Sequence, residues 1–301
     1  MQVGVVMPMG EDPEQGTTVH FPEIHERAQQ AEAAGFDSIW VYDHLIFRSP
    51  GSPASGIWEV WTVLSALAAT TQRVSLGTLV LCTAFRNPAV LAKMATTLDD
   101  ISGGRLILGL GAGWHQPEFD AFGIPFDHRA DRFQEALEII APLLREGRVD
   151  FRGKYYQAPD CELHPRGPST GGPPILIASS GQRMLRLTAR FGDLWNTAWL
   201  GRPDPLAERR ASLEAACREA GRDPATLGVT VGVNVAYGSG DEEQQAIKAG
   251  KALGGSPEEV AQGLLVYERL GVAHVICSLS EVSQASVDWL AEALKNFREG
   301  R

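Results

Sequence analysis

The sequence predicts an α/β fold: a (β/α)8 TIM barrel with insertions after the fourth strand and between the fourth helix and the fifth strand. Eight short apolar runs are each followed by a helical segment, at a spacing of about 30–40 residues that is typical of parallel βαβ units. The chain has 301 residues, of which 44% are apolar, enough for one large barrel. An open dinucleotide-binding sheet is disfavoured, because Trp114 stands where G-x-G-x-x-G needs its third glycine.

The first half of the chain supplies four of these strands. Residues 2–8 are an apolar run that ends in a proline, as a buried strand does. The helix Phe21–Ala34 places Ile24, Ala28 and Ala31 on one face before Gly35 ends it. Asn87-Pro88 begins another helix, since proline is tolerated in a first turn. We expect strands at 2–8, 36–42, 74–82 and 105–110, and helices at 21–34, 58–71 and 89–101.

The second half carries both insertions. Residues 111–127 have loop character, and Pro117 argues against a helix directly after the glycines. Arg129–Glu146 is an amphipathic helix, and residues 149–157 alternate around Arg152-Gly153 as a small hairpin does. Residues 238–256 are polar and partly helical. We expect strands at 175–178, 193–197, 229–236 and 273–278, helices at 182–191, 205–220, 257–270 and 283–297, and a single domain over residues 1–301.

The composition of the chain limits the kinds of partner it can bind and the cellular compartment in which it can work. A net charge of -10 disfavours nucleic acid and anionic membranes as partners. The four cysteines form no C-x-x-C pair, and no histidines show paired metal spacing, so we expect reduced thiols and no metal site. The N-terminus has no basic segment before its apolar run and reads as a strand rather than a signal peptide. These features predict a cytoplasmic protein.

Polar and glycine-rich segments lie at the end of five of the expected strands or directly after it. Because an active site in this fold lies at the carboxyl ends of the strands, we expect these segments to meet at one mouth. His44 could move a proton there, although a histidine bonded within its own loop is an open alternative. Ser179-Ser180-Gly181 could bind a phosphate at a helix start or act only as an ordinary N-cap. The five segments are Asp43-His44, Thr78 to Thr83, Gly111 to His115, Ser179 to Gly181 and Asn196 to Trp199.

Aromatic residues near the same mouth suggest a pocket for a flat ligand. Trp58 and Trp114 could form its walls, since tryptophan offers a broad apolar face. His115 and Glu118 would face a substrate only if the loop 111–127 folds over the mouth. Glycines at the end of a strand suit close approach of a ligand, but a structural turn without a ligand explains Gly109, Gly111 and Gly113 equally well.

Four stretches match a known family. They are AEAAGFDSIWVYDH, LGTLVLCTAFRNPAVLAKMATTLDDISGGRLILGLGAGW, EFDAFGIPF and PPILIASSGQRMLRLTARFGDLWN. On these the chain resembles the luciferase-like monooxygenase superfamily of flavin- or deazaflavin-dependent barrel oxidoreductases, from end to end. The segment GAGW, with Asp193, Trp195 and Asn196, looks more like the branch that uses coenzyme F420 than the branch that uses FMN.

The resemblance implies hydride transfer between coenzyme F420 and a small organic substrate, with His44 moving a proton beside Asp43. It implies a non-proline cis peptide at Leu79–Val80 behind the cofactor ring. The cofactor residues are then Leu79, Val80, Gly111, Gly113, Ser179, Ser180, Gly181 and Asn196, and the substrate pocket is Trp58, Trp114 and His115. Homodimers are usual in such a family.

Two alternatives and two departures accompany this resemblance. The chain could be an FMN-dependent monooxygenase that uses reduced flavin, oxygen and a separate flavin reductase, or a non-catalytic flavin-binding barrel. Trp114 stands where the sugar-phosphate dehydrogenases of the F420 branch carry a glutamate, which argues against a sugar-phosphate substrate. Ser179-Ser180 replaces a commonly glycine-rich phosphate turn, which leaves phosphate binding plausible.

Overall fold

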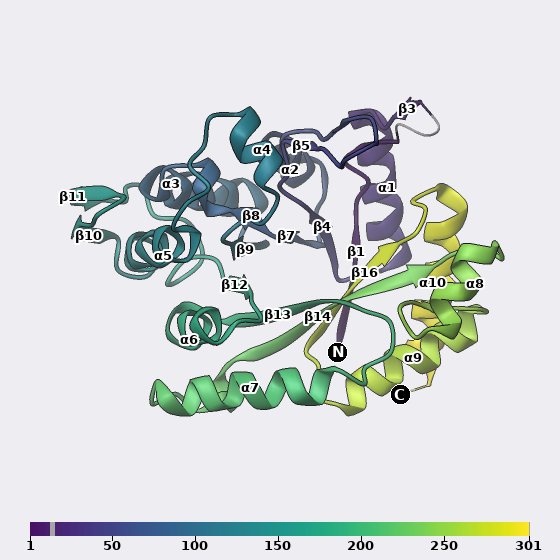
Figure 1. The fold of residues 1–301 in the computed structure, drawn as a ribbon. Helices are drawn as coiled ribbons and strands as arrows, with labels where there is room; N and C mark the ends of the chain where they lie inside the picture. The colour runs from purple at the N-terminus through teal and green to yellow at the C-terminus, as the bar shows by residue number, and fades with distance from the viewer. Residues whose placement is uncertain (13–15, 301) are drawn as a thin grey trace.

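The protein is a closed parallel β-barrel surrounded by helices in the computed structural model, which describes residues 1–12 and 16–300 (Figure 1). Over these residues, eight parallel strands pair in the order β12-β13-β14-β16-β1-β4-β7-β9, and β9 pairs with β12 to close the ring. This confirms the (β/α)8 barrel. The eight are β1 Gln2–Val6, β4 Ser38–Val41, β7 Ser75–Thr78, β9 Leu106–Gly111, β12 Ile175–Ala178, β13 Leu194–Leu200, β14 Gly228–Ala236 and β16 His274–Leu279.

One main helix follows each barrel strand and covers its outer side (Figure 1). The expected helix starts and ends agree with the structure to within about two residues, because most carry a capping residue, proline or glycine in sequence. No helix in the described part of the chain has the length and apolar character to cross a bilayer. The helices are α1 Phe21–Ala34, α2 Val60–Thr70, α3 Pro88–Ser102, α5 Arg129–Glu146, α6 Gln182–Phe191, α7 Leu206–Glu219, α9 Pro257–Arg269 and α10 Gln284–Glu299.

The segment 74–82, expected as one strand, is two. β7 ends at Thr78, and β8 Leu81–Cys82 pairs separately with β9. The hydroxyl of Thr78 donates to the carbonyl of Gly109 and accepts from its amide, which joins the two strands at the break. The Leu79–Val80 peptide between them is cis, as predicted. An unbroken apolar run hides such an interruption, since its composition is still that of a strand.

The segment 111–127 is not a plain loop, because it contains α4 Gln116–Ala121. Pro117 lies in the first turn of this helix, where the missing N–H has no intrahelical partner to lose, so the argument from proline was wrong. The second insertion contains a hairpin, as expected, but it is longer than the segment 149–157. It is formed by β10 Arg148–Arg152 and β11 Gln157–Glu162, so its second strand begins where the expected hairpin ended. Smaller additions are β2 Glu11–Asp12, β3 Thr17–Thr18, β5 Ile46–Phe47, β6 Ser55–Gly56, α8 Asp241–Lys248 and β15 Leu253–Gly254.

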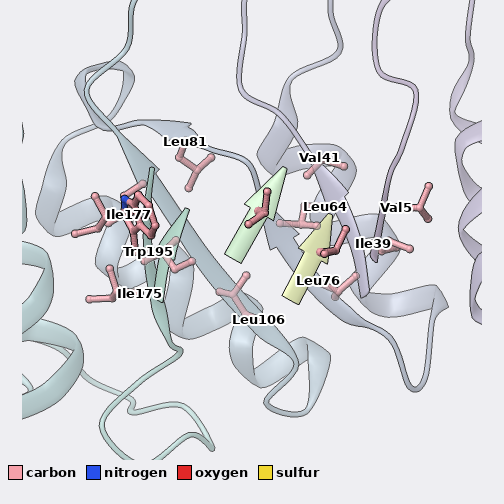
Figure 2. Packing of buried hydrophobic residues seen from close by; sticks show 14 of the residues in the cluster. Val5, Ile39, Val41, Leu64, Leu76, Leu81, Leu106, Ile175, Ile177 and Trp195 are labelled. Atoms are coloured by element: carbon pink, nitrogen blue, oxygen red, sulfur yellow. The ribbon is translucent and has the colours of Figure 1, made fainter. Parts of the chain in front are cut away.

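The strands bury both faces, and their side chains alternate between two apolar clusters. Val5, Ile39 and Leu76 lie on neighbouring strands and belong to the larger cluster, together with Leu64 of α2 (Figure 2). Val6 and Trp40, one position further on, belong to a second, smaller cluster with residues of four other segments of the barrel. This alternation between the helical layer and the barrel interior explains why the strands read as continuous apolar runs.

A buried histidine lies within the barrel beside Trp40. Trp40 Nε1 donates to Ser38 Oγ at 2.7 Å, and Ser38 Oγ lies 2.7 Å from His274 Nε2. Room for this group depends on Gly77, because a Cβ there would lie 2.1 Å from the Trp40 ring. Burial lowers the pKa of His274 from 6.5 to about 4. The ring is therefore neutral at pH 7, and its Nε2 shares a hydrogen bond with the Ser38 hydroxyl.

We expect His274 to make the free energy of unfolding depend on pH. As the pH falls below 6.5, the ring takes a proton in the unfolded chain, whereas in the folded chain it does so only near pH 4. Stability that is present above pH 6.5 is thus lost between these values, by about 3 kcal/mol at 1.36 kcal/mol per pKa unit. Urea unfolding of the protein and of His274→Gln at several pH values measures this. If the free energy of unfolding had the same pH dependence in the two proteins, this expectation for His274 would be wrong.

Candidate active site

A cavity of about 500 Å³ opens at the carboxyl ends of the barrel strands. Its wall takes residues from β1, β5, β8, β12, β13, β14, β16 and α4, and from the segments that follow β4, β7 and β9. Several segments far apart in sequence thus meet here, as the fold requires. Of the residues expected in the site, the wall includes Asp43, His44, Leu79, Val80, Gly113, Trp114 and Asn196.

His44 is held by a carboxylate that the sequence argument did not select. Nδ1 of His44 lies 3.0 and 3.2 Å from the two carboxylate oxygens of Glu118 in α4. The amide of Leu45 donates to the same carboxylate at 2.9 Å, and the Glu118 side chain is only 1% exposed. A carboxylate accepts hydrogen bonds, so Nδ1 carries the proton and Nε2 is left to exchange one. From the sequence, Glu118 was expected to face a substrate only if the loop 111–127 folds over the mouth. In the structure, the helix α4 places it beside His44.

Aromatic rings enclose His44. The ring centroid of Phe47 lies 4.3 Å from that of His44, and Trp114 lies edge-on at 5.6 Å and 78°. His115, expected in the substrate pocket, is buried outside the cavity wall, where its Nε2 accepts from the amide of Arg48 at 3.1 Å. This bond ties the segment after His44 to the start of α4. Trp58, also expected there, is not in the wall, and its Nε1 donates to the carbonyl of Val19.

Asp43 lies in the wall but its carboxylate is committed to other groups. One oxygen accepts from the amide of Cys82 at 3.0 Å and from Arg86 at 2.6 Å, and the other accepts from Arg86 at 3.3 Å. Arg86 also reaches Glu59 at 2.5 Å. Burial alone would lower the pKa of Arg86, but the Asp43 and Glu59 carboxylates raise it above its usual range. These contacts favour a positioning role for Asp43. The sequence did not indicate Arg86 as a partner of Asp43, because an arginine just before a helix is usually a surface residue.

The glycines at the end of β9 and just after it mainly allow close packing of the chain itself. A Cβ on Gly109 would lie 1.8 Å from the carbonyl of Thr78, and one on Gly111 would lie 2.7 Å from Val80. Gly111, expected to contact a cofactor, is outside the cavity wall. Gly113 is in the wall, has φ of +77°, and faces Cys82. Burial raises the pKa of the Cys82 thiol to about 12, so this sulfur is not a nucleophile at pH 7.

Gly113→Ala is expected to destabilise the protein by about 2–4 kcal/mol, from left-handed backbone strain plus overpacking. The new Cβ would lie 2.6 Å from both Cys82 Sγ and Phe119 Cζ, which would also displace α4 and Glu118. Gly123→Ala is the matched control, since its φ is +67° with open space around the Cβ position. Urea unfolding of both variants measures the difference. Equal losses would show that the contacts with Cys82 and Phe119 cost nothing.

Asn196 presents an unsatisfied acceptor beside the cavity. Its side chain is buried, and Nδ2 donates to Thr230 Oγ1 at 2.9 Å. The Thr230 hydroxyl itself donates to the carbonyl of Trp195 at 3.0 Å, which fixes the orientation of the amide. Oδ1 of Asn196 has no hydrogen-bond partner. A buried acceptor without a partner is costly, and it would be satisfied by a ligand that carries an N–H or O–H group.

The Ser179-Ser180-Gly181 turn lies outside the cavity wall, directly after Ala178, which is part of it. Ser179 does not offer a free hydroxyl, because its Oγ lies 2.8 Å from Thr188 Oγ1 and its carbonyl accepts from Trp195 Nε1. Ser180 and Gly181 are exposed, and Gly181 is the N-cap of α6. The N–H groups of the first turn of α6 therefore face outward beside them.

Comparison with known proteins gives a family and several relatives. The model of the family described as luciferase-like monooxygenase matches residues 1–249. An F420-dependent hydroxymycolic acid dehydrogenase of Mycobacterium tuberculosis is 35% identical over 67% of the chain and 55% of its own length. An F420-dependent glucose-6-phosphate dehydrogenase of Amycolatopsis mediterranei is 36% identical over 57% and 51%. The pyrimidine monooxygenase RutA of Agrobacterium fabrum is 30% identical over 77% and 67%. The chain thus spans just over half the length of the two F420-dependent relatives.

Solved structures confirm the fold. An F420-dependent secondary alcohol dehydrogenase in complex with an F420–acetone adduct superposes with a TM-score of 0.80 at 21% identity, over 99% of each chain. The EDTA monooxygenase EmoA from Chelativorans sp. BNC1 gives a TM-score of 0.80 at 16% identity, over 100% of this chain and 94% of that one. At these identities the likeness supports the barrel and not a particular reaction.

Proposed function

Because the chain belongs to the luciferase-like monooxygenase family, we propose that it is an oxidoreductase that binds coenzyme F420 in this cavity and exchanges a hydride between it and a small organic substrate. The observation that carries the proposal is the His44–Glu118 pair, which leaves Nε2 as a proton-exchanging group at the cavity. The choice of F420 rests on two F420-dependent relatives with at least 35% identity.

The residues present fit a deazaflavin. The ring of F420 carries an imide N–H, and the unpartnered Oδ1 of Asn196 would accept a hydrogen bond from such a group. Leu79, Val80 and Gly113 would supply the wall against the ring. Ser180 and Gly181, with the first turn of α6, would take the phosphate, because a helix N-terminus favours an anion. Ser179 would contribute only its backbone, since its hydroxyl is paired with Thr188.

Bound F420 supplies a ring carbon that accepts or donates a hydride. His44 takes the substrate's proton at Nε2 in oxidation and returns it in reduction. When the ring becomes an imidazolium, the Glu118 carboxylate at 3.0 Å stabilises the new charge and keeps the ring in place. Asp43, held by Arg86, fixes the start of the segment that carries His44. Phe47 and Trp114 pack against the imidazole ring of His44 and form the wall beside it.

The second candidate is an FMN-dependent monooxygenase, which the relationship to RutA favours. In that case reduced flavin would react with oxygen, and a separate flavin reductase would be the partner. For either cofactor we propose a homodimer in the cytoplasm that acts on a small molecule.

Parallel titration of the purified protein with coenzyme F420 and FMN tests the cofactor. We expect saturable quenching of F420 fluorescence, and about tenfold weaker binding by Asn196→Leu, which lacks the acceptor. Binding of FMN alone would replace the first candidate by the second. Binding of neither cofactor would contradict the proposed function.

A further inference from the structure

His115 connects the segment that carries His44 to the helix that carries Glu118. It is the N-cap residue of α4, but its side chain makes no capping hydrogen bond with that helix. Its Nε2 instead accepts from the amide of Arg48 at 3.1 Å, 67 residues earlier in the chain. The side chain is buried and lies outside the cavity wall, so this bond joins two parts of the chain and does not serve a ligand.

Glu118 and His115 hold the segment after β4 at two points. Glu118 accepts from the amide of Leu45 at 2.9 Å, and His115 accepts from that of Arg48. Between these points, the ring centroid of Phe47 lies 5.4 Å from that of His115. Arg48 and the residues directly after it are exposed. The bond to Arg48 therefore holds the segment where it enters solvent.

The bond to Arg48 requires the neutral form of His115. Nε2 accepts an N–H, so the single proton of the neutral imidazole is on Nδ1. A second proton can therefore enter only at Nε2. It would turn this acceptor into a donor that faces the N–H of Arg48, and two donors cannot share a hydrogen bond. Because imidazole side chains take up this proton at mildly acidic pH, acidification would remove the attachment.

The charged groups around His115 offer no simple substitute for this bond. Glu118 is the acidic neighbour, in the first turn of the same helix, and its carboxylate already accepts from His44 and from the amide of Leu45. The other groups are basic or become so on protonation. They are His44 and Arg48 of the attached segment and Arg129 of α5, which donates to the carbonyl of Gly113 at 2.9 Å.

We propose that His115 is a pH-sensitive positioning residue. Its neutral ring holds the segment 45–48 against α4, and its protonation releases Arg48 and frees that segment to move. The effect on turnover rests on the proposed function, since release would loosen the contact of Phe47 with His44. The attachment itself needs no cofactor, so it is measured on the protein alone.

Amide hydrogen exchange of the cofactor-free protein, resolved by NMR at about pH 7.5 and about pH 5.5, tests the release on either side of the ordinary titration of imidazole. With exchange rates corrected for the intrinsic effect of pH, the protection factor of the Arg48 amide should fall about fivefold at the lower pH, the weight of one ordinary hydrogen bond. The Leu45 amide, which Glu118 holds, should keep its protection and serves as the internal reference. Equal protection of Arg48 at both pH values would overturn the proposal.

Two substitutions separate His115 from the other titrating groups. His115→Gln keeps an oxygen acceptor that does not titrate in this range, so the protection of Arg48 should be the same at both pH values. His115→Leu removes the acceptor, so the protection should be low at both. A fall in His115→Gln as large as in the wild type would assign the titration to another group, and the proposal would be wrong. This comparison decides the matter even if His115→Leu does not fold.

His164→Gln is the matched control. The side chain of His164 is 73% exposed and lies outside the cavity wall, so this variant should show the wild-type fall in Arg48 protection. His274, which also titrates in acid, is unchanged in every variant and does not affect the comparison. Failure of the protein to bind F420 would contradict the proposed function, but it would leave the exchange results and the role of His115 intact.

Discussion

Replacement of His44 by alanine is expected to lower kcat by about 10²–10⁴-fold, the usual contribution of a positioned acid–base group. The reason is geometric: Glu118 holds Nδ1 at 3.0 Å, and Nε2 is left to exchange the substrate proton. Affinity for F420 should change little, because Asn196 and the start of α6 are unaltered. Steady-state kinetics and fluorescence titration on the same preparation measure the two quantities.

A second histidine provides the control for this experiment. His164 also lies near a carboxylate, with its Nε2 3.2 Å from Glu162, but its side chain is 73% exposed and it lies outside the cavity wall. His164→Ala should keep the full kcat. If His44→Ala kept it too, the proton would move through another group, and the mechanism proposed for His44 would be wrong.

Replacement of Asp43 by alanine is expected to lower the free energy of unfolding by about 3–5 kcal/mol, as loss of one partner of a buried ion pair does. The variant leaves the Arg86 guanidinium without its 2.6 Å partner and the Cys82 amide without an acceptor. Urea unfolding measures the loss.

The control for Asp43 is an exposed ion pair. Asp150 lies 3.7 Å from Arg152, and both side chains are more than 60% exposed, so Asp150→Ala should leave the unfolding midpoint unchanged. Suppose instead that Asp43→Ala unfolded like the wild type but lost turnover. Asp43 would then act in the reaction directly, as the resemblance implied, and the positioning role would be wrong.

The barrel itself was predictable from local patterns. Apolar runs of strand length, helix caps and the glycines after helices recur along the chain, and each depends only on neighbouring residues. Local patterns failed where one composition suits two structures. The run 74–82 reads as one strand but is interrupted at Leu79–Val80, and Pro117 reads as a helix breaker but begins α4.

The site was predictable only in part. Asp43-His44, Gly113-Trp114 and Asn196 could be placed at one mouth, because parallel strands in a barrel end on the same face. The partners of these residues could not be placed. Glu118 lies 74 residues from His44, and Arg86 lies 43 from Asp43, and no spacing rule connects such pairs. Trp58 and His115 satisfied the same sequence criteria as Trp114, yet their side chains bond to backbone outside the cavity.

The order of strands and helices, and the end of the barrel at which polar residues gather, were therefore determined by the sequence alone, because hydrophobic periodicity and chain direction suffice for both. Only the tertiary structure decided which nitrogen of His44 is free, which carboxylate is neutralised by Arg86 and which tryptophans face the cavity. These depend on side-chain contacts between distant segments, and such contacts exist only once the barrel has closed.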